Sequence, residues 1–125
     1  MKPIVLTIGA LLLTAASGGG FAIGDKPFQQ ADILDARAEP ELDGTAGIML
    51  TFEPAAAKRL EALTRANLSK PITVTLDGKM IASPTIAEPI TTGVLTISGG
   101  FTVPQAEELA KRISGKEPLP EEFEE

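Results

Sequence analysis

The chain has 125 residues, more acidic than basic side chains and a net charge of −6. This length allows one domain, and the acidity argues against binding to the phosphate backbone of a nucleic acid. Cysteine and histidine are both absent. Their absence excludes disulfides and cysteine zinc sites and removes the usual general base near neutral pH. We therefore expect no catalytic residue, no cofactor and no resident metal ion.

The first 22 residues have the three-part pattern of a secretory signal peptide. Lys2 supplies a positive start, residues 3–16 are almost entirely apolar, and Gly20-Phe21-Ala22 fits a small-x-small cleavage site. The apolar run is shorter than the about 20 residues that a membrane span needs. The mature protein is therefore expected to be periplasmic or secreted, with no membrane span after cleavage. An uncleaved N-terminal membrane anchor is the alternative.

Two strands are predicted after this signal. Residues 23–30 are polar and are interpreted as a linker. Residues 31–38 alternate between apolar and charged side chains, which predicts a strand. One face of that strand would carry Leu34, Ala36 and Ala38. Residues 47–52 predict a second strand, and apolar side chains on both of its faces place it in the centre of a sheet.

A helix is predicted for residues 54–67, followed by a β-hairpin. Pro54 suits the first helical position because its missing N–H would be unpaired there, and apolar side chains recur at helical spacing. Residues 72–76 and 79–82 predict the two strands of the hairpin. The dipeptide Asp77-Gly78 between them is typical of a type I′ turn, which needs positive φ at both central positions.

The last predicted elements are a strand over residues 93–98 and a helix that begins after Thr102. Thr102 and Gln105 form a capping box, and Gly115 suits the position just beyond the helix. Residues 116–125 form an acidic tail that we expect to be mobile. The residues expected to shape the turns, strand ends and caps of this half are Asp77, Gly78, Gly93, Gly99, Phe101 and Thr102.

This order of elements predicts a single small α+β domain over residues 31–115. Hairpin-linked strands followed by helices favour a mainly antiparallel sheet of about four to five strands, with two helices on one face. The pattern does not determine the order of the strands in the sheet.

The segment 83–92, called here the 83–92 connection, is not fully explained by folding signals. Its two prolines most simply shape a link between strands, but prolines also hold a backbone extended and available to a peptide partner. We therefore select it as the candidate polypeptide contact, made by Ser83, Pro84, Ile86, Pro89 and Ile90. Other motifs have structural readings: Ser83 and Ser98 lack a histidine or lysine partner, and the acidic residues of segment 32–43 do not match a calcium loop.

Several short motifs, in order, resemble one known family. LDGKMIASP (residues 76–84), EPITTG (88–93), ISGGFT (97–102) and AEELA (106–110) resemble the head subdomain of the first periplasmic domain of SecD. SecD is the accessory membrane subunit of the bacterial preprotein translocase. Thr64 and Asn67 also fit the Thr-x-x-Asn helix end of that family. The resemblance covers roughly residues 31–120.

The resemblance implies an α+β head outside the cytoplasmic membrane that contacts translocating or unfolded polypeptide, or the Sec machinery. It does not imply motor activity, since the membrane helices and the proton-coupling Asp of the family have no counterpart here. We therefore expect a stand-alone, secreted binding module. The alternative is a periplasmic interaction or structural domain unrelated to secretion, for example one that oligomerises through a sheet edge. An enzyme is the least favoured reading, and the oligomeric state is not predicted.

Overall fold

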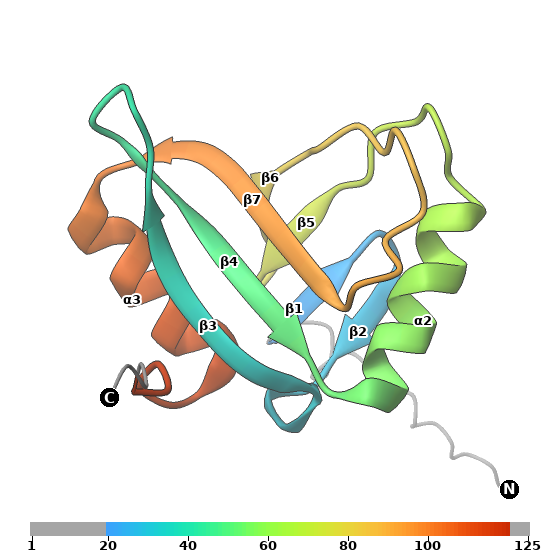
Figure 1. Cartoon of the computed structure of the whole chain (residues 1–125), viewed down its shortest axis with the longest axis horizontal. Helices are drawn as coiled ribbons and strands as arrows, with labels where there is room; N and C mark the ends of the chain where they lie inside the picture. Colours follow the sequence, from blue (N-terminus) through green and yellow to red (C-terminus); the bar gives the residue numbers. More distant parts are fainter. Residues whose placement is uncertain (1–19, 121–125) are drawn as a thin grey trace, which may run out of the picture.

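The computed structural model describes residues 20–120, which form two antiparallel sheets and two α-helices around one core (Figure 1). The three-stranded sheet has the order β3 (Ile33–Pro40), β4 (Ala46–Phe52), β7 (Val94–Phe101). The four-stranded sheet has the order β2 (Lys26–Phe28), β1 (Phe21–Ile23), β5 (Val74–Leu76), β6 (Lys79–Ala82). The helices are α2 (Pro54–Arg65) and α3 (Val103–Ser114), and a short 3-10 turn, η2 (Gln30–Asp32), precedes β3.

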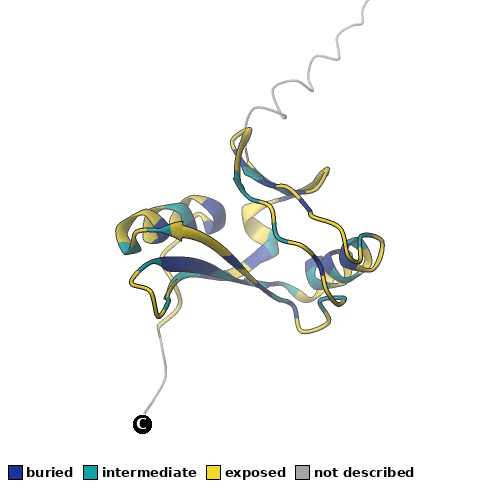
Figure 2. Cartoon of the chain, turned by 90° about the horizontal axis from the view of Figure 1, so that it is seen from above, coloured by how far each residue is buried: buried dark blue, intermediate teal, exposed yellow. Residues whose placement is uncertain are grey.

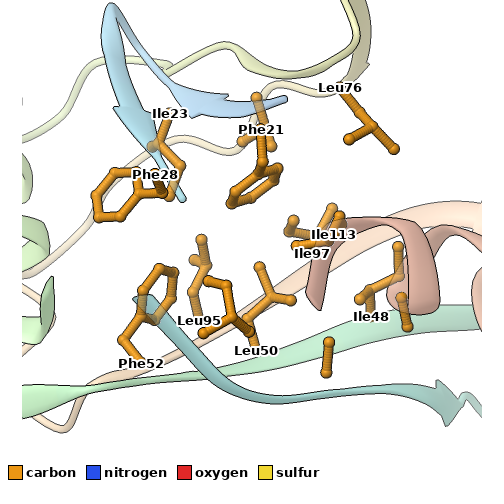
Figure 3. Close-up of a cluster of buried hydrophobic side chains, with 14 of the residues drawn as sticks. Phe21, Ile23, Phe28, Ile48, Leu50, Phe52, Leu76, Leu95, Ile97 and Ile113 are labelled. Carbon is orange, nitrogen blue, oxygen red and sulfur yellow. The ribbon is translucent and has the colours of Figure 1, made fainter. Parts of the chain in front are cut away.

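The core lies between the two sheets. β4 is the central strand of its sheet, as predicted, and it buries Ile48, Leu50 and Phe52 on its inner face. Phe21 and Phe28 of the four-stranded sheet lie opposite them (Figure 3). The rings of Phe28 and Phe52 meet edge to face with their centroids 5.3 Å apart, an arrangement that aromatic pairs prefer.

The two helices lie at opposite ends of the inner side of the three-stranded sheet (Figure 2). α3 packs on β3 and β4 through Ala106, Ala110 and Ile113. α2 closes the other end of the core with Ala56 and Leu60. The α+β class is therefore confirmed, but the strands divide between two sheets where the sequence predicted one.

The segment predicted as a linker is a β-hairpin. β1 pairs with both β2 and β5, and Phe21, Ile23 and Phe28 are buried in the core. The predicted signal boundary at residue 22 therefore falls inside β1, while residues 1–19 of that signal lie outside the described part of the chain. Strands of three residues are too short to show a period, so only their long-range pairing with β5 identifies them.

The alternation predicted for β3 is interrupted near its start. The register with β4 shifts between Ile33 and Asp35, so Leu34 is exposed and does not share the buried face of Ala36. Ile33 is buried in its place. A β-bulge of this kind reverses the face on which the preceding side chains lie. A prediction based only on alternation with a period of two does not detect the bulge.

Part of the predicted mobile tail is bonded to β3. The Asp35 carboxylate accepts a 2.7 Å hydrogen bond from the backbone N–H of Leu119, and Arg37 donates to the Leu119 carbonyl. Lys116 Nζ donates to the Ile33 carbonyl at 2.9 Å. Residues 116–120 are therefore part of the folded domain, and residues 121–125 lie outside the described part.

Local signals for turns and caps are confirmed. Asp77 and Gly78 have φ values of 53° and 85°, as a type I′ turn requires. The Thr102 hydroxyl accepts from the Gln105 N–H, and the Gln105 side chain accepts from the Thr102 N–H. Gly115 ends α3 with a φ of 77°.

β7 extends past its predicted end at Ser98 and reaches Phe101. The ring of Phe101 folds back over Gly99, where an added Cβ would lie 2.6 Å from ring atoms. At the start of β7, the Gly93 carbonyl accepts from the Phe52 N–H at 2.9 Å, with Gly93 at a φ of 77°. Each glycine therefore occupies a place that a side chain would disturb.

Candidate functional site: the 83–92 connection

The 83–92 connection leaves β6, crosses toward α2 and returns to β7. Its backbone is bonded to residues 69–72, the segment that leads from α2 into β5. Ile86 donates to the Lys70 carbonyl and accepts from the Ser69 N–H, and the Pro84 carbonyl accepts from the Ile72 N–H at 2.9 Å. The first half of the connection is therefore held as an extended segment through the backbone groups of Pro84 and Ile86.

The second half of the connection is held by α2. Thr64 is buried, and its hydroxyl accepts a 2.9 Å hydrogen bond from the backbone N–H of Ile90 while donating to the Glu61 carbonyl. Asn67 Nδ2 donates to the Leu63 carbonyl at the end of the helix. The sequence pattern did not predict this bond, because a hydroxyl bond to a residue 26 positions away leaves no local signal.

The five predicted contact residues differ in exposure. Ser83 is exposed, whereas Pro84, Pro89 and Ile90 are half-buried. Ile86 is 6% exposed and belongs to the core, so its side chain is not available to a partner in this conformation. The burial corrects the choice of Ile86, which followed from reading the connection as a surface loop. The exposed side chains of the connection are Ser83, Thr85, Ala87, Glu88, Thr91 and Thr92.

The connection itself and the chain that follows it as far as Ala110 carry no basic side chain. From Met80 to Ala110 the chain contains Glu88, Glu107 and Glu108 but neither lysine nor arginine. Across the backbone pairing with residues 69–72, the exposed residue Lys70 lies opposite the connection, because its carbonyl accepts from the Ile86 N–H.

Asp77, in the turn between β5 and β6, connects this turn to the residue before β1 and to α3. Its carboxylate accepts from the backbone N–H of Gly20 at 2.8 Å and from Arg112 Nη2 at 2.6 Å. The Gly20 N–H, followed by the Arg112 guanidinium, lowers the pKa of Asp77 below its ordinary value. Asp77 and Arg112 also line a groove of about 910 Å³ that shares no residue with the 83–92 connection.

A second carboxylate with structural partners is that of Asp35 on β3. Asp35 is buried, and Arg37 Nε lies 2.8 Å from its carboxylate. The Arg37 hydrogen bond lowers the pKa of Asp35, with a further contribution from the Leu119 N–H. The role of this acid is to hold residues 116–120, since both of its partners are structural.

Over residues 20–120 no group of three metal-ligating side chains gathers at one point. In the same range no helix has the length and apolar character needed to cross a membrane. The 83–92 connection is an extended segment held in place by residues 69–72 and by Thr64 of α2.

Comparison with known proteins agrees with this architecture. The family model for the SecDF P1 head subdomain matches residues 14–116. A protein translocase subunit SecDF from Thermus thermophilus is 40% identical over 91 residues, which are 72% of this chain and 12% of that protein. A SecD subunit from Dictyoglomus turgidum is 36% identical over 89 residues, or 70% of this chain and 22% of that protein.

A solved structure of SecDF, described as a membrane component that enhances protein export, superposes with a TM-score of 0.63 at 37% identity. The superposition covers 73% of this chain and 41% of the other. The chain therefore spans only a small part of its curated relatives. With most of its length matched by the family model, the chain belongs to the SecDF P1 head subdomain family.

Proposed function

We propose that this protein acts in the periplasm as a binding module that contacts translocating or unfolded polypeptide or the export machinery. Membership of the SecDF head family carries the proposal, because the relatives are named as protein translocase subunits. The chain spans 12% and 22% of two of these relatives. The proposal is therefore confined to binding and includes neither motor nor enzymatic activity.

The 83–92 connection is the proposed contact surface. Ser83 is exposed, and Pro84, Pro89 and Ile90 each retain part of their surface. The bonds to residues 69–72 and to Thr64 hold the segment before any partner arrives. A segment that is already ordered loses less conformational entropy on binding.

Site-specific photocrosslinking in living cells tests the proposed contact. A photoreactive residue at Glu88, which is exposed in the connection, is expected to crosslink to exported polypeptides or to Sec subunits. The matched control is the same residue at Lys58, which is exposed on α2. Equal yields at the two positions, or products with neither class of protein, would contradict the proposal.

A second experiment measures binding with purified components. The protein is expected to slow the aggregation of a reduced, unfolded exported protein in a light-scattering assay. The variant Pro89→Ser/Ile90→Ser removes apolar surface from the connection and keeps the core residue Ile86. This variant should lose most of the protection while its urea midpoint shows that it remains folded.

A further inference from the structure

The two sheets have four edge strands, and the chain protects three of them. The start of the β3 edge is shielded by residues 116–120, where Lys116 donates to the Ile33 carbonyl and Leu119 to the Asp35 carboxylate. β2 has three residues including Pro27, whose carbonyl accepts from Arg59 Nη1 at 3.2 Å. β6 has only four residues and is followed by Ser83-Pro84, where Pro84 has no backbone N–H to donate to a neighbouring strand. Short length, prolines and covering segments are the usual means of protecting a sheet edge.

β7 differs from these three strands. It has eight residues, and among the described residues it pairs only with β4. β6 approaches β7 but belongs to the other sheet. The stretch Val94 to Ser98 reads VLTIS, which has high β-propensity and contains neither charge nor proline. It therefore lacks the side chains with which an edge strand ordinarily discourages pairing.

The register determines which backbone groups face outward. In an antiparallel pair, residues alternate between exchanging both hydrogen bonds with their partner and pointing these groups away. Gly93 accepts from Phe52, and the register is regular from Val94 to Ser98. The backbone groups of Leu95 and Ile97 therefore face β4, and those of Thr96 and Ser98 face away from it. Thr92 Oγ1 accepts from the Val94 N–H at 3.3 Å and marks the start of the open stretch.

We propose that the outer edge of β7, from Val94 to Ser98, binds an extended polypeptide segment as an added strand. Regularly spaced outward N–H and C=O groups are complementary to the backbone of another extended chain. The proposal rests on the proposed function and states how the polypeptide would be held: by backbone pairing, which requires no particular side-chain sequence. The 83–92 connection leads directly into this edge through Gly93, so Pro89 and Ile90 lie next along the chain.

Local charge favours a neutral or basic segment. The Glu41 carboxylate accepts from Ser98 Oγ at 2.9 Å, at the far end of the open stretch. β7 itself carries no charged side chain, and no lysine or arginine occurs in the sequence from Met80 to Ala110. A lysine at the end of the added strand beside Ser98 would complement Glu41.

The test uses the purified protein and the synthetic peptide acetyl-KVTVTVK-amide. Nitrogen-15 NMR is expected to show that the outward amides of Thr96 and Ser98 shift and exchange more slowly with solvent when the peptide is added. The inward amides of Leu95 and Ile97 already bond to β4 and should change much less. Thr96→Pro removes one outward N–H and should weaken peptide binding at least about tenfold. Thr96→Ala keeps that N–H and should bind as the parent does.

The outcomes separate this inference from the proposed function. If unfolded protein or peptide binds but the Thr96 and Ser98 amides do not respond, the edge inference is overturned and the proposed function stands. If neither binds, both fail. If β7 mediates self-association instead, sedimentation will show a dimer that Thr96→Pro abolishes, which also overturns the inference. Should Thr96→Pro unfold the protein, Thr96→Lys/Ser98→Lys provides a second variant, because like charge on the edge should repel the basic peptide.

Discussion

The buried hydroxyl of Thr64 on α2 accepts a hydrogen bond from the backbone N–H of Ile90, across 26 positions of sequence. This single bond joins the helix to the segment that the sequence had marked as a loop. The 83–92 connection is therefore a fixed part of the fold, held at one end by residues 69–72 and at the other by α2. Under the proposed function, this prior order would reduce the conformational entropy lost on binding.

Replacing Thr64 should loosen the connection. Thr64→Val keeps the shape of the side chain but leaves the Ile90 N–H without its acceptor, which should lower the free energy of unfolding by about 1–3 kcal/mol. Urea denaturation measures the loss, and hydrogen exchange should report faster exchange at Ile90 than in the parent protein. Thr73→Val, at an exposed position of the same kind of residue, is the control and should change little. An unchanged Ile90 amide in the Thr64 variant would contradict the role assigned to that bond.

Removing the Asp35 carboxylate should release the C-terminal segment from β3. Asp35→Ala leaves the Leu119 N–H and the Arg37 side chain without this acceptor, and we expect a cost of about 1–3 kcal/mol in stability. Limited proteolysis followed by mass spectrometry should then detect cleavage at Lys116. Asp25→Ala tests an exposed acid outside this network. If the Asp35 variant resists proteolysis as well as the parent does, residues 116–120 are held by other contacts.

The carboxylates of Asp35 and Asp77 should make stability depend on pH in the acid range. Both have pKa values below the ordinary value in the folded protein. Their stabilising effect is therefore fully present above the unfolded pKa of about 3.9 and is lost as the pH falls through the lower folded values.

The share due to Asp77 can be isolated with Asp77→Asn, which tolerates the positive φ of the turn. The difference in urea midpoint between the parent and this variant should be largest near about pH 6 and should shrink toward about pH 2. A constant difference across that range would mean that Asp77 contributes through turn geometry and not through its charge.

The start of the mature protein should lie at or before Gly20. A chain that begins at Ile23, as the predicted cleavage site would produce, lacks the buried Phe21 and two of the three residue pairs that β1 forms with β5. Loss of a buried Phe side chain alone costs about 3–5 kcal/mol, so this chain should unfold at much lower urea than one that begins at Gly20. N-terminal sequencing of the exported protein gives an independent check, and a mature end at Ile23 with full stability would refute the assignment of β1 to the core.

The sequence alone determined the elements whose signals are local. The Asp77-Gly78 turn, the Thr102–Gln105 capping box and the alternation of β4 are all decided within a few residues, because φ preferences, caps and side-chain periods act over that range. The motifs of segment 76–110 likewise indicated the family, because their order and spacing can be read from the sequence alone.

Only the tertiary structure decided the features that depend on partners distant in the chain. The hairpin of β1 and β2 exists because β5 pairs with β1, and Ile86 is buried because residues 68–72 bond the connection to the core. The same holds for the tail, which Asp35 and Lys116 attach to β3. In each case a short or polar segment gains its structure from contacts with residues distant in the chain. The entropy lost in forming such contacts and the packing energy gained depend on the whole fold, so no local sequence pattern predicts them.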